Sequence, residues 1–161
     1  MVMQELPAPK VVTPPPPANL NPEGLRLRSV EREFLERLTP LLGTPRAIKK
    51  LVNLYRLLRL GVSEDRLNEF IGGNQGGPYQ AAAILLAALV GAPNAARRWL
   101  QSLAKIEPGQ DIVDAIESTT LRELIVLIRK DIPVHGDPTT YRRWAATVAR
   151  YGFETYDLFA G

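Results

Sequence analysis

The chain has 161 residues, of which 45% are hydrophobic and 23% charged, and its formal net charge is +3. It contains no cysteine and a single histidine, His135. These counts exclude a disulfide scaffold, a structural zinc finger and a thiol nucleophile. A Ser-His-Asp triad would depend on His135 alone. The composition therefore argues against most enzyme chemistry.

The first residues differ in composition from the rest of the chain. Half of the 14 prolines fall within the first 22 positions, four of them in succession at 14–17. Successive prolines lack backbone donors and favour the polyproline II conformation. We therefore expect residues 1–24 to form a disordered Pro-rich arm or linker. Residues 25–161 are numerous enough for one domain with a hydrophobic core.

The remainder reads as helices in chain order, because apolar residues recur at helical spacing and no run alternates with the period of a strand. The fold is predicted to be an all-α bundle of about seven helices. Apolar spacing, capping residues and helix breakers place the expected helices at 29–42, 45–60, 63–71, 79–90, 93–106, 120–130 and 139–150, with a weaker one at 110–117.

Local signals define the ends of several of these helices. Ser29 is the expected N-cap of the first helix, and Pro40 is expected to kink its last turn. Glu31, with Glu33 and Glu36, is assigned to the solvated face of this helix. Thr120 and Glu123 fit a capping box that opens a later helix.

Other candidate residues are assigned mainly to structure. His135 lies in a predicted loop, and without cysteine or a second histidine it is not expected to bind a metal. Trp99 and Trp144 are spaced as core residues, with binding to a partner or stacking on a base as the alternative. The aromatic segment 151–159 either wraps on the bundle or exposes a patch for another domain or subunit.

The excess of positive charge is local. Nine basic residues lie between Arg26 and Arg59 against three glutamates, and no acid occurs from 43 to 61. In the helix at 45–60, the apolar side chains share one face. The opposite face carries Arg46, Lys49, Lys50, Asn53 and Arg56. This face predicts an anionic partner, or else it is a solvated surface without a ligand.

The start of this helix is unusual in its charge. Thr44 is the expected N-cap and Pro45 the first helical residue, which places Arg46 in the first turn. A cation there is unfavourable by a few tenths to about 1 kcal/mol, because the helix dipole is positive at this end. One explanation is an oxyanion held by free N–H groups and the guanidinium. The other is an ion pair with a carboxylate such as Glu36 or Glu64.

The segment 38–59, LTPLLGTPRAIKKLVNLYRLLR, resembles the C-terminal region of KAP-type and related STAND P-loop NTPases. There a Pro-Arg pair opens a helix that continues with lysines, an asparagine and Tyr-Arg. The wider resemblance covers most of 25–155 and includes an Ala-Leu helix and the pair Tyr141 and Trp144. It implies a helical lid over the nucleotide, in which Arg46 resembles a sensor-2 arginine that contacts the phosphates.

The resemblance also implies partners. No Walker A or Walker B motif occurs in the chain, so we expect no ATP hydrolysis and no cofactor in isolation, with ATP bound in the parent NTPase. The implied partner is an NTPase core in cis or in trans, with control of oligomerisation, in a setting of bacterial antiviral defence. The alternatives are a standalone basic helical domain that binds nucleic acid weakly, and a protein-interaction module without a ligand.

The sequence also predicts where the protein resides. Its longest apolar run, 81–92, is shorter than the roughly 20 residues that a bilayer requires. The N-terminus lacks the charged and apolar regions of a signal peptide. We therefore expect a cytoplasmic protein that makes no contact with a membrane.

Overall fold

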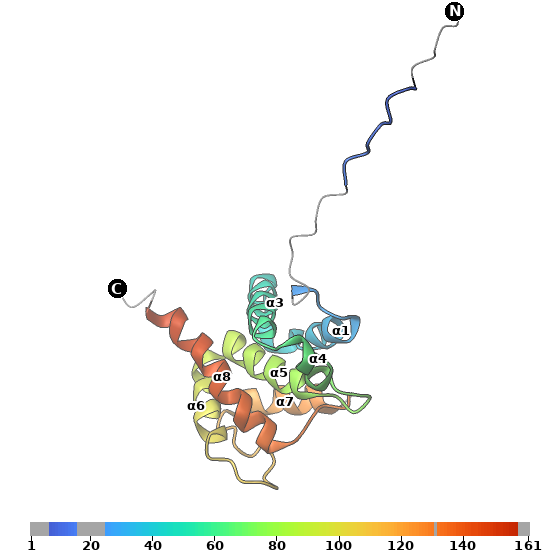
Figure 1. Cartoon of the computed structure of the whole chain (residues 1–161). Helices are drawn as coiled ribbons and strands as arrows, with labels where there is room; N and C mark the ends of the chain where they lie inside the picture. Colours follow the sequence, from blue (N-terminus) through green and yellow to red (C-terminus); the bar gives the residue numbers. More distant parts are fainter. Residues whose placement is uncertain (1–6, 16–24, 131, 158–161) are drawn as a thin grey trace, which may run out of the picture.

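The structure, a computed structural model, describes residues 7–15, 25–130 and 132–157, with only the backbone described for 153–157. These residues form eight α-helices and no strand, which confirms the predicted all-α bundle (Figure 1). Residues 7–15 are exposed and form no helix or strand, and the rest of the expected arm lies outside the described residues. The helices are α1 (Ser29–Arg37), α2 (Thr39–Leu42), α3 (Pro45–Leu60), α4 (Glu64–Ile71), α5 (Pro78–Gly91), α6 (Pro93–Leu103), α7 (Thr119–Lys130) and α8 (Pro138–Asp157).

Helix α5 forms the centre of the bundle (Figure 1). Every residue from Tyr79 to Leu89 is buried, as expected for a helix that is apolar on all sides. The surrounding helices α1, α2, α3, α4, α6 and α8 all pack against it. The most apolar segment of the sequence is thus the common core against which the other helices are placed.

The predicted helix at 29–42 is two helices, and this part of the prediction is wrong. Helix α1 ends before Leu38, and α2 begins at Thr39. Pro40 has no N–H to donate to the carbonyl of Glu36, and its ring would clash with that carbonyl in a continuous helix. The Thr39 hydroxyl donates to the Glu36 carbonyl instead. Pro40 therefore ends the helix at Arg37, three residues upstream, rather than kinking it.

Residues 110–117, predicted to be a weak helix, form turns instead. The Asp111 carboxylate accepts a hydrogen bond from the Val113 N–H at 3.1 Å, a local side-chain contact that competes with helix formation. The carbonyl of Ile112 accepts from the indole of Trp99 at 3.0 Å. This segment therefore supplies apolar side chains to the core without regular structure.

The ends of α7 and α8 also differ from the prediction. The hydroxyl of Ser118, and not of Thr120, accepts a hydrogen bond from a first-turn N–H, that of Leu121, at 3.3 Å. Helix α8 continues past Arg150 to Asp157. Gly152 does not end it, because its backbone lies against the Leu89 side chain of α5 and packing holds the helix together there. The aromatic side chains of 153–159 lie outside the described residues.

Tyr141, in the first turns of α8, carries a polar atom without a partner. Its ring is fully buried and lies 6.4 Å from that of Trp99. Its hydroxyl is buried, and no described residue hydrogen-bonds it. Burial raises the pKa of this hydroxyl above its ordinary value. An unsatisfied buried hydroxyl is destabilising because it has lost water without gaining a protein partner.

Replacing Tyr141 with phenylalanine is therefore expected to raise the free energy of unfolding by about 1 kcal/mol. The matched control is Tyr55→Phe, which removes a hydroxyl that does hydrogen-bond and should lower stability. Urea unfolding followed by circular dichroism measures both. A loss of stability in Tyr141→Phe would show that the hydroxyl has a partner after all.

Candidate functional site

The predicted start of α3 is confirmed. Thr44 is the N-cap, its hydroxyl accepts from the Ala47 N–H at 3.2 Å, and Pro45 is the first helical residue. The Ile48 N–H donates to the Thr44 carbonyl at 3.1 Å. Because proline has no N–H, only the N–H of Arg46 is left without an acceptor among the described residues of this turn. The backbone therefore offers an anion one donor, where the sequence suggested several.

The predicted basic face of α3 is exposed. Leu51, Tyr55 and Leu58 are buried on the opposite face. The residues predicted for this face, Arg46, Lys49, Lys50, Asn53 and Arg56, are all exposed. Helical geometry places them within one half of the helix circumference. A partner that approaches α3 from solvent would therefore meet an amide and four cations.

Arg46 has neither of the ion-pair partners considered from the sequence. Within the described part of the chain, Arg46 forms no ion pair with Glu36 or Glu64. The ion pairs found there join Arg59 to Glu31, Arg98 to Glu117 and Arg129 to Asp111. The cation in the first turn is thus uncompensated within these residues, which is the arrangement that an external anion would stabilise.

A buried ionic network, which the sequence analysis missed, joins α1 to α3. The Glu31 side chain is fully buried, so its assignment to the solvated face is wrong. One of its oxygens accepts from the Tyr55 hydroxyl at 2.6 Å and from the Arg59 Nε at 2.7 Å. The other accepts from the Arg28 N–H at 2.7 Å. Glu31 precedes Phe34 by three residues, and this spacing was the available signal of its burial.

This network affects the candidate site in two ways. It removes Arg59 from the basic surface, because that side chain is only 2% exposed. It also fixes the direction of α3 relative to α1 through a charged hydrogen bond. Burial, followed by the hydrogen bond to Glu31, raises the pKa of Tyr55 well above its ordinary value. The hydroxyl therefore remains a donor at neutral pH.

The structure also places the other candidate residues. His135 lies in the predicted loop. Its ring Nε2 lies 3.0 Å from the Thr140 hydroxyl, and its backbone N–H donates to the Gln80 side-chain oxygen at 2.8 Å. Among the described residues, no group of His, Asp or Glu is placed to hold a metal ion. Trp99 is fully buried, in agreement with the core assignment.

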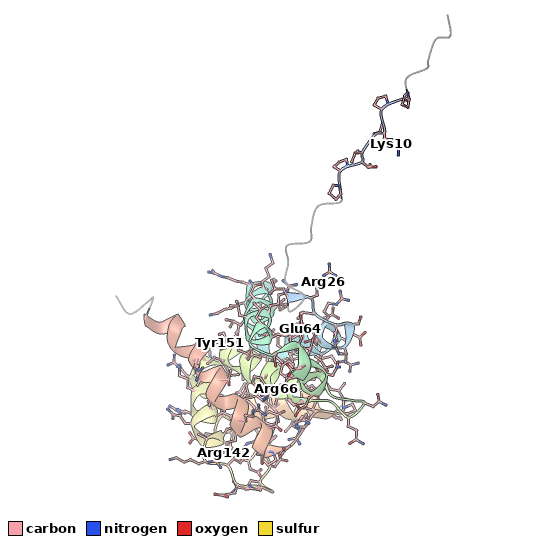
Figure 2. The ribbon with its side chains drawn as sticks, viewed as in Figure 1. Lys10, Arg26, Glu64, Arg66, Arg142 and Tyr151 are labelled. Carbon is pink, nitrogen blue, oxygen red and sulfur yellow. The ribbon has the colours of Figure 1, made fainter. Side chains whose placement is uncertain are left out.

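Trp144 is half-buried and lies 5.2 Å from the ring of Phe70. It borders a surface cavity of about 440 Å³ that Arg66 and Arg143 also line. Glu69 lines the same cavity and offsets one of the two positive charges. Figure 2 shows Arg66 well apart from Arg26, which lies near the start of α1. The cavity at Trp144 is thus less basic than the exposed face of α3.

Comparison with known protein families, curated proteins and solved structures finds no match for this chain. Of the helices that the structure describes, none has both the length and the apolar character needed to cross a membrane.

Proposed function

We propose that the chain is a helical lid and regulatory domain of a STAND- or KAP-like NTPase, in which Arg46 contacts the phosphates of a nucleotide held by another domain. The observation that carries the proposal is the start of α3, where an exposed arginine and its own N–H lack partners among the described residues. The resemblance of segment 38–59 to the NTPase lids supports the assignment of phosphate as the anion.

The geometry limits what this site does alone. One guanidinium and one N–H provide only part of a phosphate site, since a P-loop surrounds phosphate with several N–H groups, a lysine and a metal ion. The isolated chain should therefore bind nucleotide weakly and hydrolyse none. Its role is to add one positive charge when the NTPase core presents its nucleotide to α3.

The buried network provides a way to transmit that contact. Because Glu31 ties α1 to α3 and α5 packs against both, a force on Arg46 moves the helices together. A rigid-body movement of this kind is one of the recurrent ways in which nucleotide state is communicated. Oligomerisation controlled by the lid is the regulatory output that we propose.

Replacing Arg46 with alanine tests this function in two measurements. The melting temperature of the isolated chain should not fall, because the side chain is exposed and its loss removes an unfavourable charge from the first turn. ATP hydrolysis by the chain joined to an NTPase core that carries a Walker A motif should drop severely, up to the roughly 10³-fold of a weak arginine finger.

Arg37→Ala is the matched control, since Arg37 carries the same charge and is exposed on α1 rather than in the first turn of α3. It should change neither the melting temperature nor hydrolysis. The proposal would be refuted if Arg46→Ala made the isolated chain less stable and left ATP hydrolysis by the joined NTPase unchanged. Arg46 would then have a purely structural role.

The nucleic-acid alternative relies on a smaller basic surface than the sequence indicates. Arg59 is buried against Glu31, and the Arg28 guanidinium donates to the Asn68 side chain at 3.0 Å. Electrostatic binding to a phosphate backbone strengthens with the number of cations that contact it. The burial of Arg59 removes one cation from that surface, and Arg28, although exposed, has part of its guanidinium engaged by Asn68; this weakens the alternative relative to the lid.

A further inference from the structure

A second basic site lies beyond the start of α3. Three arginines line a surface cavity of about 570 Å³ together with Leu25 and Leu27. Arg26 comes from the segment before α1, Arg32 from α1 and Arg56 from α3. No carboxylate is among the described residues that line it. Figure 2 shows Arg26 beside the region where the chain enters α1.

The guanidinium groups of these arginines are unpaired among the described residues, whereas neighbouring arginines are not. Arg28 bonds Asn68, and Arg59 pairs with Glu31. The fold thus neutralises Arg59 and gives the Arg28 guanidinium a neutral amide partner, whereas Arg26, Arg32 and Arg56 lie around one hollow. Like charges that share a cavity with apolar walls produce a strongly positive potential, which attracts an anion of more than one charge.

We propose that this cavity binds a ligand that carries two or three linked phosphates. Guanidinium forks match phosphate oxygens in bidentate geometry, and linked phosphates concentrate enough negative charge to meet three arginines in a small volume. Among the described residues that line the cavity none is aromatic, so these residues provide no stacking platform of the kind typical of single-stranded nucleic-acid sites. The leucines provide apolar contact for an organic group attached to the phosphates.

This site is separate from the one proposed for the lid. Arg46 and Arg56 are ten residues apart on α3, which corresponds to about 15 Å along the helix axis. The Arg46 contact requires a nucleotide held by another domain, whereas the cavity is formed within this chain. The two proposals therefore stand or fall independently.

Calorimetric titration of the whole chain with inorganic tripolyphosphate, at an ionic strength of about 0.15 M, tests the cavity. Arg32→Gln and Arg56→Gln should each weaken binding about tenfold or more, because each removes charge-assisted hydrogen bonds. The matched control is Arg37→Gln, which removes the same charge from α1 outside this cavity. It should change the affinity less than about twofold, because Arg37 does not line the cavity and exposed charges are partly screened at this ionic strength.

Two further arms define the ligand and separate the two sites. Inorganic phosphate should bind much more weakly than tripolyphosphate. Metal-free ATP should bind at least as tightly as tripolyphosphate. If ATP binds more tightly, the ligand is a nucleotide rather than a bare phosphate chain. Arg46→Gln should weaken tripolyphosphate binding much less than Arg32→Gln or Arg56→Gln does, because Arg46 does not line the cavity and provides only part of a phosphate site.

The proposal is overturned if tripolyphosphate fails to bind at millimolar concentration. It is equally overturned if Arg32→Gln and Arg56→Gln weaken binding no more than Arg37→Gln does, or if inorganic phosphate binds as tightly as tripolyphosphate. A single-stranded oligonucleotide that binds more tightly than tripolyphosphate, and that Arg32→Gln, Arg56→Gln and Arg37→Gln all weaken to the same extent, would assign the surface to nucleic acid instead.

Discussion

Replacing Glu31 with alanine should lower the free energy of unfolding by about 3–5 kcal/mol. The change leaves the Arg59 guanidinium inside the protein without its carboxylate, and it removes the acceptor of the Tyr55 hydroxyl. A buried cation that loses its carboxylate keeps the cost of desolvation but loses the Coulombic attraction of that carboxylate. Urea unfolding measured by circular dichroism gives the difference directly.

Glu33→Ala is the control, because Glu33 lies two residues away on the same helix and is exposed. Its effect should stay within about 0.5 kcal/mol. The double variant with Glu31→Leu and Arg59→Met should recover much of the loss, since an apolar pair of similar size avoids burying charge. Equal stability of the Glu31→Ala and Glu33→Ala variants would contradict the buried network.

Gly91→Ala is the second large effect, with an expected loss of about 1–3 kcal/mol. A Cβ atom placed on Gly91 would clash with the carbonyl oxygen of Leu41, so α2 and the end of α5 would have to move apart. The clash involves backbone rather than the end of a flexible side chain. It should outweigh the gain of about 0.5–1 kcal/mol that alanine brings to a helix.

Gly73→Ala provides the comparison, because nothing lies within 4 Å of a Cβ atom at Gly73. That substitution should leave the free energy of unfolding nearly unchanged. If Gly91→Ala unfolds at the same urea concentration as Gly73→Ala, the close approach of α2 to α5 does not exist in solution.

The fold could be predicted from the sequence where apolar spacing and capping residues agreed. The helix at 45–60 is correct in both bounds, because Thr44, Pro45 and Gly61 mark its ends. The segment 110–117 was misassigned, since its apolar residues at short spacing fit a turn that folds into the core as well as they fit a helix. The packing of this segment against Trp99 favours the turn over the helix. That packing depends on the tertiary structure, which the sequence pattern does not give.

The candidate site could be predicted in part. The exposed face of α3 follows from helical periodicity, which needs no knowledge of the rest of the fold. The burial of Glu31 and Arg59 does not follow from periodicity. A charged residue is expected at the surface unless its partner is known. Glu31 and Arg59 pair with each other but are 28 residues apart in the sequence. The three-arginine cavity was missed for the same reason, since its residues come from three segments.

The central position of α5 has a consequence for synthesis of the protein. The helices that cover it are α1–α4, which precede it in the chain, and α6 and α8, which follow it. At about 5–20 residues per second, the ribosome needs some 3–12 s to extend the chain from Gly91 to Gly152. During that interval the side of α5 that α6 and α8 will cover stays open to water. The nascent chain therefore presents a long Ala-Leu surface of the kind that chaperones bind, and folding is completed only after α8 leaves the ribosome.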